Sequence, residues 1–324
     1  MANFIGATVN IGLGKEGTRG TAVVPAVWVP KSSFDFNDQA EYVRQEAPYG
    51  VIEQNMDADV SKLMGQGALE IPVFSESIGY ILGAAFGAFP TPSSGAAGTY
   101  LHDFTVAQTS QHQSLTIHRK DGNEHVRYAL AMLDSVEFTY SLDDYLMCNA
   151  TFMSKQGTTT SGTASYTEEA KFRPQDVTMT IADTIAGLSG GTEVKVEEFT
   201  LTIEKNLEEY QVHGSVDLND IFNNRFAYSG SMTILWNSTD YKGWFKDGTK
   251  KAFEIDAVNT SETVGSGSEN PQLRFQMSPS VIEEWSMEED NDGVVKQTIG
   301  FTGLYDLANE QSLLCRLKNE TASY

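Results

Sequence analysis

The chain has 324 residues, of which 40% are hydrophobic and 10% aromatic, so it is long enough to bury a sizeable core. It carries 44 acidic and 22 basic residues, a formal net charge of -22. This excess of acid argues against a protein that grips DNA, because binding by counterion release requires clustered lysine and arginine. The charge fits a well-solvated acidic surface, or a surface that must not hold a passing polyanion.

Other features restrict the location and the redox chemistry. The longest apolar stretch, residues 78–89, is too short and too rich in Gly and Ala to span a membrane. The N-terminus lacks the basic and apolar regions of a secretion signal, so nothing points outside the cell that made the chain. Cys148 and Cys315 do not make a disulfide framework, and we expect both thiols to be reduced and buried.

The predicted elements are mainly β-strands. They are short segments of alternating polarity, rich in Val, Ile, Thr, Phe and Tyr and bounded by Gly, Asn, Asp or Ser. In chain order they are residues 33–36, 68–73, 114–118, 136–140, 145–154, 194–203, 231–236, 253–258, 273–277, 281–287 and 294–301. The dipeptides Asp121-Gly122 and Asp292-Gly293 predict hairpin turns.

Helices are expected to be few. Residues 75–86 and 238–246 each predict one short helix, with a serine near the start and a glycine at or just beyond the end, and residues 309–317 are a third candidate. Residues 90–98 and 157–165 predict loops, and the Gly-rich stretch 185–192 predicts the junction between two halves.

The chain also contains an internal echo. The segment that begins at Met132 (MLDSVEF) resembles the one that begins at Met277 (MSPSVIE), and the Gly-led strand at Gly67 resembles that at Gly230. The predicted helices that follow these Gly-led strands, at Ser75 and Ser238, keep the same order. We interpret this order as a long duplicated unit.

Two connections, residues 50–65 and 214–229, recur at matching places in the two halves. Each is long for a structureless loop in a compact domain and contains apolar residues. Two interpretations remain equally open: a long hairpin with its own packing, or a loop that docks on a neighbouring subunit. On the second interpretation the candidate contact residues are Val51, Ile52, Met56, Leu63, Ile221 and Phe222.

Two polar clusters invite a metal-binding interpretation and fit it poorly. Residues 288–293 (EEDNDG) resemble part of a calcium loop but lack its closing Glu, and a hairpin turn explains the same residues. Residues 118–125 contain two histidines and two acids, but no zinc-ligand spacing fits, and a solvated loop is favoured. We therefore expect no metal site.

No pattern in the chain predicts catalysis or a cofactor. It has no Gly-x-Ser-x-Gly elbow, no phosphate-binding Gly-x-x-x-x-Gly-Lys-Ser/Thr loop and no HExxH. Gly12, Gly14 and Gly17 lie near the N-terminus rather than between a parallel strand and a helix, so a nucleotide site is not expected. The favoured interpretation is a structural protein, not an enzyme.

Three stretches resemble a known family. The segment 11–30 (IGLGKEGTRGTAVVPAVWVP), the Gly67–Gly87 block, and Tyr100-x-His102-x-Phe104 followed by residues 114–117 are similar to tail tube proteins of long-tailed bacteriophages. These stretches lie within residues 5–155, and the second half agrees mainly in the order of its elements. The echo favours the two-domain version of that family.

The resemblance implies a mainly β fold: two tandem tail-tube-type β-sandwich or barrel domains, each with a short helix, and extended terminal arms. The implied boundaries are an N-terminal arm over 1–30, a first tube domain over 31–185, a second over 193–305 and a C-terminal arm over 306–324. The arms would bridge stacked rings.

The resemblance also implies a function in the virion tail, in a tube assembled in the host bacterial cytoplasm. Trimeric, pseudo-hexameric rings would stack into a hollow conduit for phage DNA, which would pass without specific binding. The expected partners are other copies of the chain and the tape measure, terminator and distal tail proteins, with no cofactor and no membrane. Candidate lumen-facing residues are Asp35, Glu137, Glu198 and Glu204; a one-residue slip in register would turn them away.

Two alternatives are kept. The chain could be another phage structural protein on a related sandwich, such as a distal tail hub or a capsid-associated protein. It could instead be a β-sandwich carbohydrate-binding module that uses tryptophans as sugar-stacking platforms, although core or interface anchors explain them better. The tryptophans are Trp28, Trp236, Trp244 and Trp285.

Overall fold

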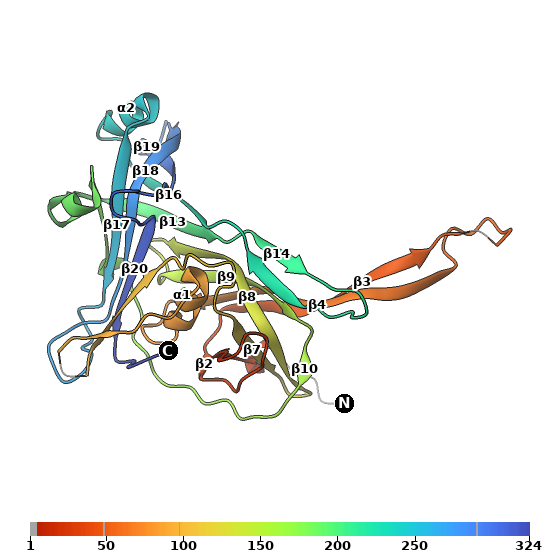
Figure 1. Cartoon of the computed structure of the whole chain (residues 1–324). Helices are drawn as coiled ribbons and strands as arrows, with labels where there is room; N and C mark the ends of the chain where they lie inside the picture. The colour runs from red at the N-terminus through yellow and green to blue at the C-terminus, as the bar shows by residue number, and fades with distance from the viewer. Residues whose placement is uncertain (1–4, 48, 97, 290) are drawn as a thin grey trace.

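A computed structural model describes residues 5–47, 49–96, 98–289 and 291–324 (Figure 1). The chain is mainly β, as predicted. Its strands in the first half are β1 (Asn10–Lys15), β2 (Val27–Val29), β3 (Ser33–Gln45), β4 (Asp57–Pro72), β5 (Ser93–Ser94), β6 (Tyr100–Thr105), β7 (Leu115–Lys120), β8 (His125–Tyr140), β9 (Met147–Lys155) and β10 (Thr158–Thr159).

The second half continues with strands of similar lengths. They are β11 (Val177–Ala182), β12 (Thr192–Val194), β13 (Val196–Glu204), β14 (Leu207–Tyr210), β15 (Asp220–Asn223), β16 (Ala227–Leu235), β17 (Lys250–Val258), β18 (Gln272–Glu288), β19 (Lys296–Thr302) and β20 (Leu313–Asn319). The helices are α1 (Ile78–Phe86) and α2 (Asp240–Asp247), with 3-10 turns η1 (Gly6–Thr8), η2 (Pro174–Asp176) and η3 (Ile185–Gly190).

The strands pair in the same pattern twice. In the first unit, β2-β1-β7-β8 form one sheet and β3-β4-β9-β8 form another, so the long strand β8 runs through both. In the second unit, β12-β11-β17-β18 and β13-β16-β19-β18 repeat this arrangement around β18. The echo in the sequence is therefore a repeat of strand pairing.

The irregularities in the pairing recur as well. The β8–β9 ladder shifts register between Leu133 and Ser135, and the β18–β19 ladder shifts between Ile282 and Glu284. A β-bulge is a specific feature of a ladder, so we take Leu133 as the counterpart of Ile282. Gly67 then corresponds to Gly230, because they pair with Phe152 and Phe301, which oppose Leu133 and Ile282 respectively.

One part of the sequence alignment was wrong. Matching Met132 with Met277 places the second strand four residues out of register, since the bulges make Ala131 the counterpart of Ser280. A shift of four leaves every side chain on the same face of a strand, so the alternation of polarity does not detect it. The match of Gly67 with Gly230 agrees with the register.

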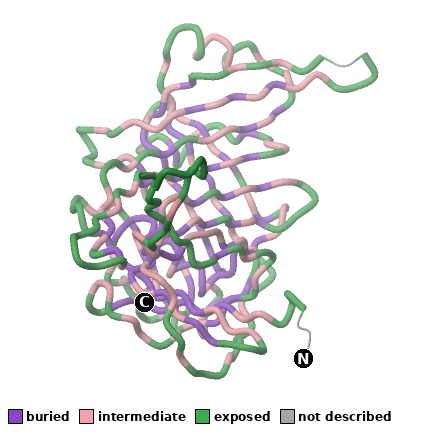
Figure 2. Tube along the Cα trace, turned by 90° about the vertical axis from the view of Figure 1, so that its right-hand side faces the viewer, coloured by how far each residue is buried: buried purple, intermediate pink, exposed green. Residues whose placement is uncertain are grey.

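The two units join through their backbones. Residues Ser135–Tyr140 of β8 pair antiparallel with Phe199–Glu204 of β13. This pairing makes one continuous sheet in the order β3-β4-β9-β8-β13-β16-β19-β18, which we call the joined sheet. The buried positions of both units form one hydrophobic core, shown in purple in Figure 2.

The two long connections have their own structure. Residues 50–65 complete a long hairpin of β3 and β4 that projects from the body (Figure 1). Residues 214–229 include β15, which pairs with β14, and the start of β16. The second connection lies against the base of the first, where Leu63 N donates to Val216 O at 2.8 Å. The hairpin interpretation of residues 50–65 is therefore right, and its tip remains available for a neighbour.

The two terminal segments, which the sequence interpretation assigned to extended arms, each contain a strand that pairs in a sheet. β1 pairs with β7, and Ile11 and Leu13 are fully buried. β20 lies between β18 and β6, so the predicted helix over 309–317 is wrong. The reason is visible in the alternation of Leu313, Cys315 and Leu317, which are all buried on one face of the strand.

The pairing bears on the domain boundaries. β11, which the sequence interpretation assigned to the first domain, pairs with β17 of the second unit. β1 and β2 occupy the same positions in the first unit as β11 and β12 do in the second. We therefore propose a boundary between β10 and β11.

A matched pair of substitutions tests whether the N-terminal segment is structural. We expect Ile11→Ala to lower the free energy of unfolding by about 2–5 kcal/mol, because it leaves a cavity beside β7. Ile5→Ala should change it by no more than about 0.5 kcal/mol, because Ile5 is 67% exposed. Denaturant titration measures both, and equal effects would contradict a buried β1.

Candidate assembly surfaces

The outward face of the joined sheet brings together the four acidic residues singled out from the sequence. Asp35, Glu137, Glu198 and Glu204 are all exposed. The partners across the strands form a continuous row from Asp35 through Ala68, Thr151 and Ser135 to Glu204. Paired residues on neighbouring strands share a face, so these side chains stand on one surface.

That surface is polar and mostly acidic. Between the acids stand small hydroxyl side chains, and Thr202 Oγ1 donates to Glu137 Oε2 at 3.5 Å across the β8–β13 ladder. By register, further acidic side chains on this face include Glu41, Glu70, Glu284 and Glu288, and Lys62, Lys155 and Lys296 stand among them. An acidic face of this kind repels phosphates.

The opposite face at the junction of the two units is apolar and closed. Val136 and Phe138 of β8 are buried against Phe199 and Leu201 of β13. The ring of Phe138 also contacts that of Phe275, with 4.9 Å between centroids. Burial of this apolar surface stabilises the join in addition to the backbone hydrogen bonds.

Lys205 follows β13 and is fully buried at the same junction. Its ammonium donates to the carbonyl oxygen of Ala84 near the end of α1 at 2.8 Å, an interaction typical of a cation at a helix C-terminus. Burial, with a smaller contribution from Arg19, lowers the pKa of Lys205 to about 7. This contact ties the second unit to the helix of the first.

The joined sheet ends in two edges without a partner strand in the described part of the chain. β3 pairs only with β4 there, and the second half of β18 pairs only with β19. Phe36 on β3 is buried, whereas three other core-facing side chains at these edges are half-buried: Phe34 on β3, and Trp285 and Met287 on β18. Their counterparts at the internal junction, Phe199, Val136 and Phe138, are buried. The two edges therefore carry the counterparts of the residues that pair at the internal junction, but without a strand beside them.

The tip of the β3–β4 hairpin exposes apolar side chains. Ile52 is 101% exposed and Val51 49% exposed, while Met56 is half-buried. The other three candidate contact residues lie elsewhere. Leu63 contacts Val216, Ile221 is buried in a small cluster with Met132 and Leu218, and Phe222 meets the ring of Tyr210 edge-on. Ile221 is therefore part of the internal packing rather than a contact surface.

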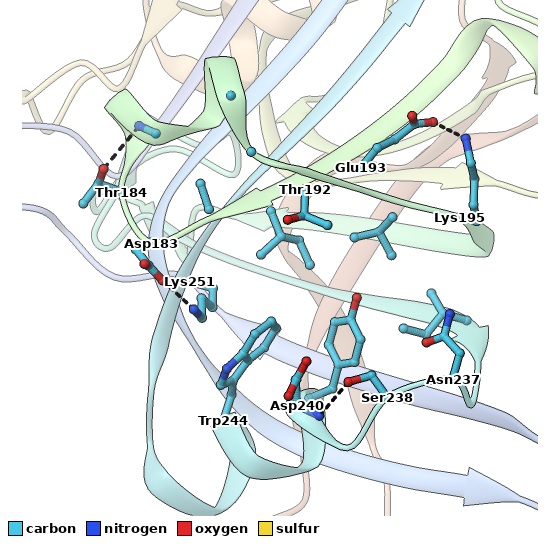
Figure 3. Close-up of a pocket in the computed structure, with 18 residues that line it drawn as sticks. Asp183, Thr184, Thr192, Glu193, Lys195, Asn237, Ser238, Asp240, Trp244 and Lys251 are labelled. Atoms are coloured by element: carbon cyan, nitrogen blue, oxygen red, sulfur yellow. Dashed lines mark hydrogen bonds and ion pairs between the residues drawn. The ribbon is translucent and has the colours of Figure 1, made fainter.

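The two helices differ in their burial. Every residue of α1 except Tyr80 is buried, whereas α2 has no buried residue. A cavity of about 830 Å³ separates α2 from β11 and β12, and Figure 3 shows Lys251 there beside Asp183 and Trp244. In the first unit, Phe89 and the C-terminal Tyr324 pack between β1 and α1.

The two polar clusters lie at the β7–β8 and β18–β19 hairpins. Among residues 5–47, 49–96, 98–289 and 291–324, no group of three or more His, Cys, Asp or Glu could hold a metal. His118 and His125 pack under Trp28 with 3.0 Å between ring nitrogens, and burial lowers the pKa of both. Residues 288–293 join β18 to β19 in a hairpin, with Asp290 outside the described residues.

The remaining predictions concern cysteines, tryptophans and membranes. Cys148 and Cys315 are free and buried, as expected, and burial raises the pKa of each thiol. Trp28 is buried, whereas Trp236, Trp244 and Trp285 are half-buried, and Trp236 packs on Trp285. The described helices include none long and apolar enough to cross a bilayer.

Comparison with known proteins agrees with this architecture. Residues 6–303 match the model of a family described as phage tail tube protein. No curated protein matches the chain. The match covers nearly the whole chain and both units, including the two open edges. The chain therefore belongs to the phage tail tube protein family.

Proposed function

We propose that three copies of this chain close into a ring, in which two fused units per copy occupy six equivalent positions. The observation that carries this proposal is the match between the internal junction and the two open edges. The second half of β18 is the counterpart of the β8 segment that pairs with β13, and β3 is the counterpart of β13. A head-to-tail contact of this kind generates a ring when its rotation closes.

The internal junction supplies a register for the contact between copies. Phe138 opposes Leu201 in the chain, so Met287 opposes Phe36 of the next copy. Closure covers the half-buried Phe34, Trp285 and Met287, and it removes two exposed strand edges that otherwise invite aggregation.

A charge placed on this edge tests ring closure. We expect Met287→Glu to prevent rings and tubes, because the carboxylate would be buried against Phe36 of the next copy without a partner. Leu307→Glu is the matched control, since Leu307 is 85% exposed and lies outside the joined sheet. Electron microscopy of both folded proteins gives the answer, and tubes from Met287→Glu would refute the contact.

We further propose that the β3–β4 hairpin bridges one ring to the next, as expected for Val51, Ile52 and Met56. The exposed apolar tip supports this role, because a monomer gains nothing from exposing such side chains to water. Other tail proteins, such as tape measure, terminator and distal tail proteins, would contact the assembled tube inside and at its ends.

Polar substitutions at the tip of the β3–β4 hairpin test the stacking of rings separately from the closure of each ring. We expect Val51→Ser combined with Ile52→Ser to leave single rings and to raise the concentration needed for tubes by roughly tenfold or more, because the apolar contact between rings is lost. Sedimentation and microscopy distinguish rings from tubes. Normal tubes at normal concentration would show that the tip does not bridge rings.

The acidic face of the joined sheet would line the bore and let DNA slide without binding. Asp35, Glu137, Glu198 and Glu204 stand on that face, and like charge keeps the phosphate backbone from settling on the wall. This arrangement explains why a protein that conducts DNA carries a net charge of -22.

Neutralising these acids should slow DNA release. We expect Glu137→Gln, Glu198→Gln and Glu204→Gln together to lengthen ejection from phage particles by roughly twofold to tenfold, with assembly unchanged. The control is Glu124→Gln, Glu262→Gln and Glu310→Gln, which removes the same charge from exposed positions off the joined sheet. Equal ejection times in both variants would mean that the acidic face does not line the bore.

A further inference from the structure

In the proposed ring, on which this inference rests, the contact between copies would include a residue pair that the internal junction lacks. At the internal junction, Val136 opposes Ile203, and both are buried and apolar. The counterpart of Val136 is Trp285, and the counterpart of Ile203 on β3 is Asp38. Ring closure therefore places a carboxylate of the next copy directly across from a tryptophan.

Asp38 faces the core side of β3, in line with Phe34 and Phe36. In the single chain its side chain is exposed and accepts a hydrogen bond from Gly157 N at 2.7 Å. Covering β3 with another strand removes water from this carboxylate, which is costly unless a cation or further donors replace the water.

A cation already stands at the facing edge. The ammonium of Lys242, on α2, lies 4.6 Å from the centre of the Trp285 ring and 6.0 Å from that of Trp236. The Trp285 ring is held in place because its Nε1 donates to Gln297 Oε1 at 3.0 Å. Directly opposed residues have Cβ atoms about 5 Å apart, within reach of a long lysine side chain.

We propose that Lys242 of one copy and Asp38 of the next form an ion pair over Trp285 that fixes the register of the ring. A slip of two residues would place Phe36 or Ala40 at this point and leave the carboxylate without its cation. The pair also distinguishes the contact between copies from the apolar internal junction. It gives the otherwise unburied helix α2 a position over the seam.

The charges on the other face of the sheet fit the same register. Asp35 of the next copy falls opposite Glu288, because their counterparts Thr200 and Thr139 are paired. Lys296 lies directly across from Glu288 on the adjacent strand, where it pairs with Glu197 at 2.6 Å, and its charge reduces the repulsion between the two carboxylates. The seam is thus apolar and ion-paired on its core side and acidic on its outward side.

A charge swap tests the pair in the full-length protein. We expect Lys242→Glu and Asp38→Lys each to raise the critical concentration for tube formation by about tenfold or more, since each places like charges together. The double variant should return it to within about threefold of the unmodified protein, because the pair is restored with reversed polarity. Thermal unfolding of the unassembled variants checks that each one folds.

The outcomes separate this pair from the ring itself. A double variant no better than the worse single variant, or a Lys242→Glu variant that polymerises normally, overturns the ion pair. If Met287→Glu then still prevents rings, the ring stands and only the pair fails. If Met287→Glu also forms normal tubes, the edge contact and the pair fail together.

Discussion

The backbone pairing of β8 with β13 is the interaction on which the rest of the structure depends. It joins two sandwiches into one sheet, buries Val136, Phe138, Phe199 and Leu201, and places Lys205 under the end of α1. In the joined sheet, β3 at one end and the second half of β18 at the other remain unpaired on their outer sides in the described part of the chain. In the proposed ring, this internal pairing is the pattern for the contact between copies.

The differences between the units follow from this arrangement. α1 is buried because the internal junction, β6 and Tyr324 surround it, whereas α2 lies at the end that would face the next copy in the proposed ring. The half-buried Trp285 and the cation at Lys242 belong to the same end. The unburied helix, the half-buried tryptophan and the cation of a single chain therefore lie together where the neighbouring copy is proposed to bind.

Much of this could be predicted from sequence, for definite physical reasons. Alternation of polarity located most of the strands and placed Glu137 and Glu204 on exposed positions, because each lies between buried neighbours. Glu198 is also exposed, although the residue before it, Glu197, is half-buried. The Gly-led strands were matched correctly since Gly67 and Gly230 face the same aromatic partners. The correspondence between the residues of β8 and those of β18 was not predicted correctly. A shift of four residues keeps every side chain on the same face, so only the bulges reveal the error.

Long-range pairing accounts for the other errors. Residues 313–319 form a strand between β18 and β6, which are distant in sequence, and Ile221 is buried in a cluster with Met64, Leu130 and Met132 from the first half of the chain. The central claim, that three chains of two fused units each fill six equivalent positions, is tested most directly by counting chains per ring in electron cryomicroscopy of assembled tubes. Three chains per ring, each contributing two similar sectors, is the expected result, and six chains per ring would contradict it.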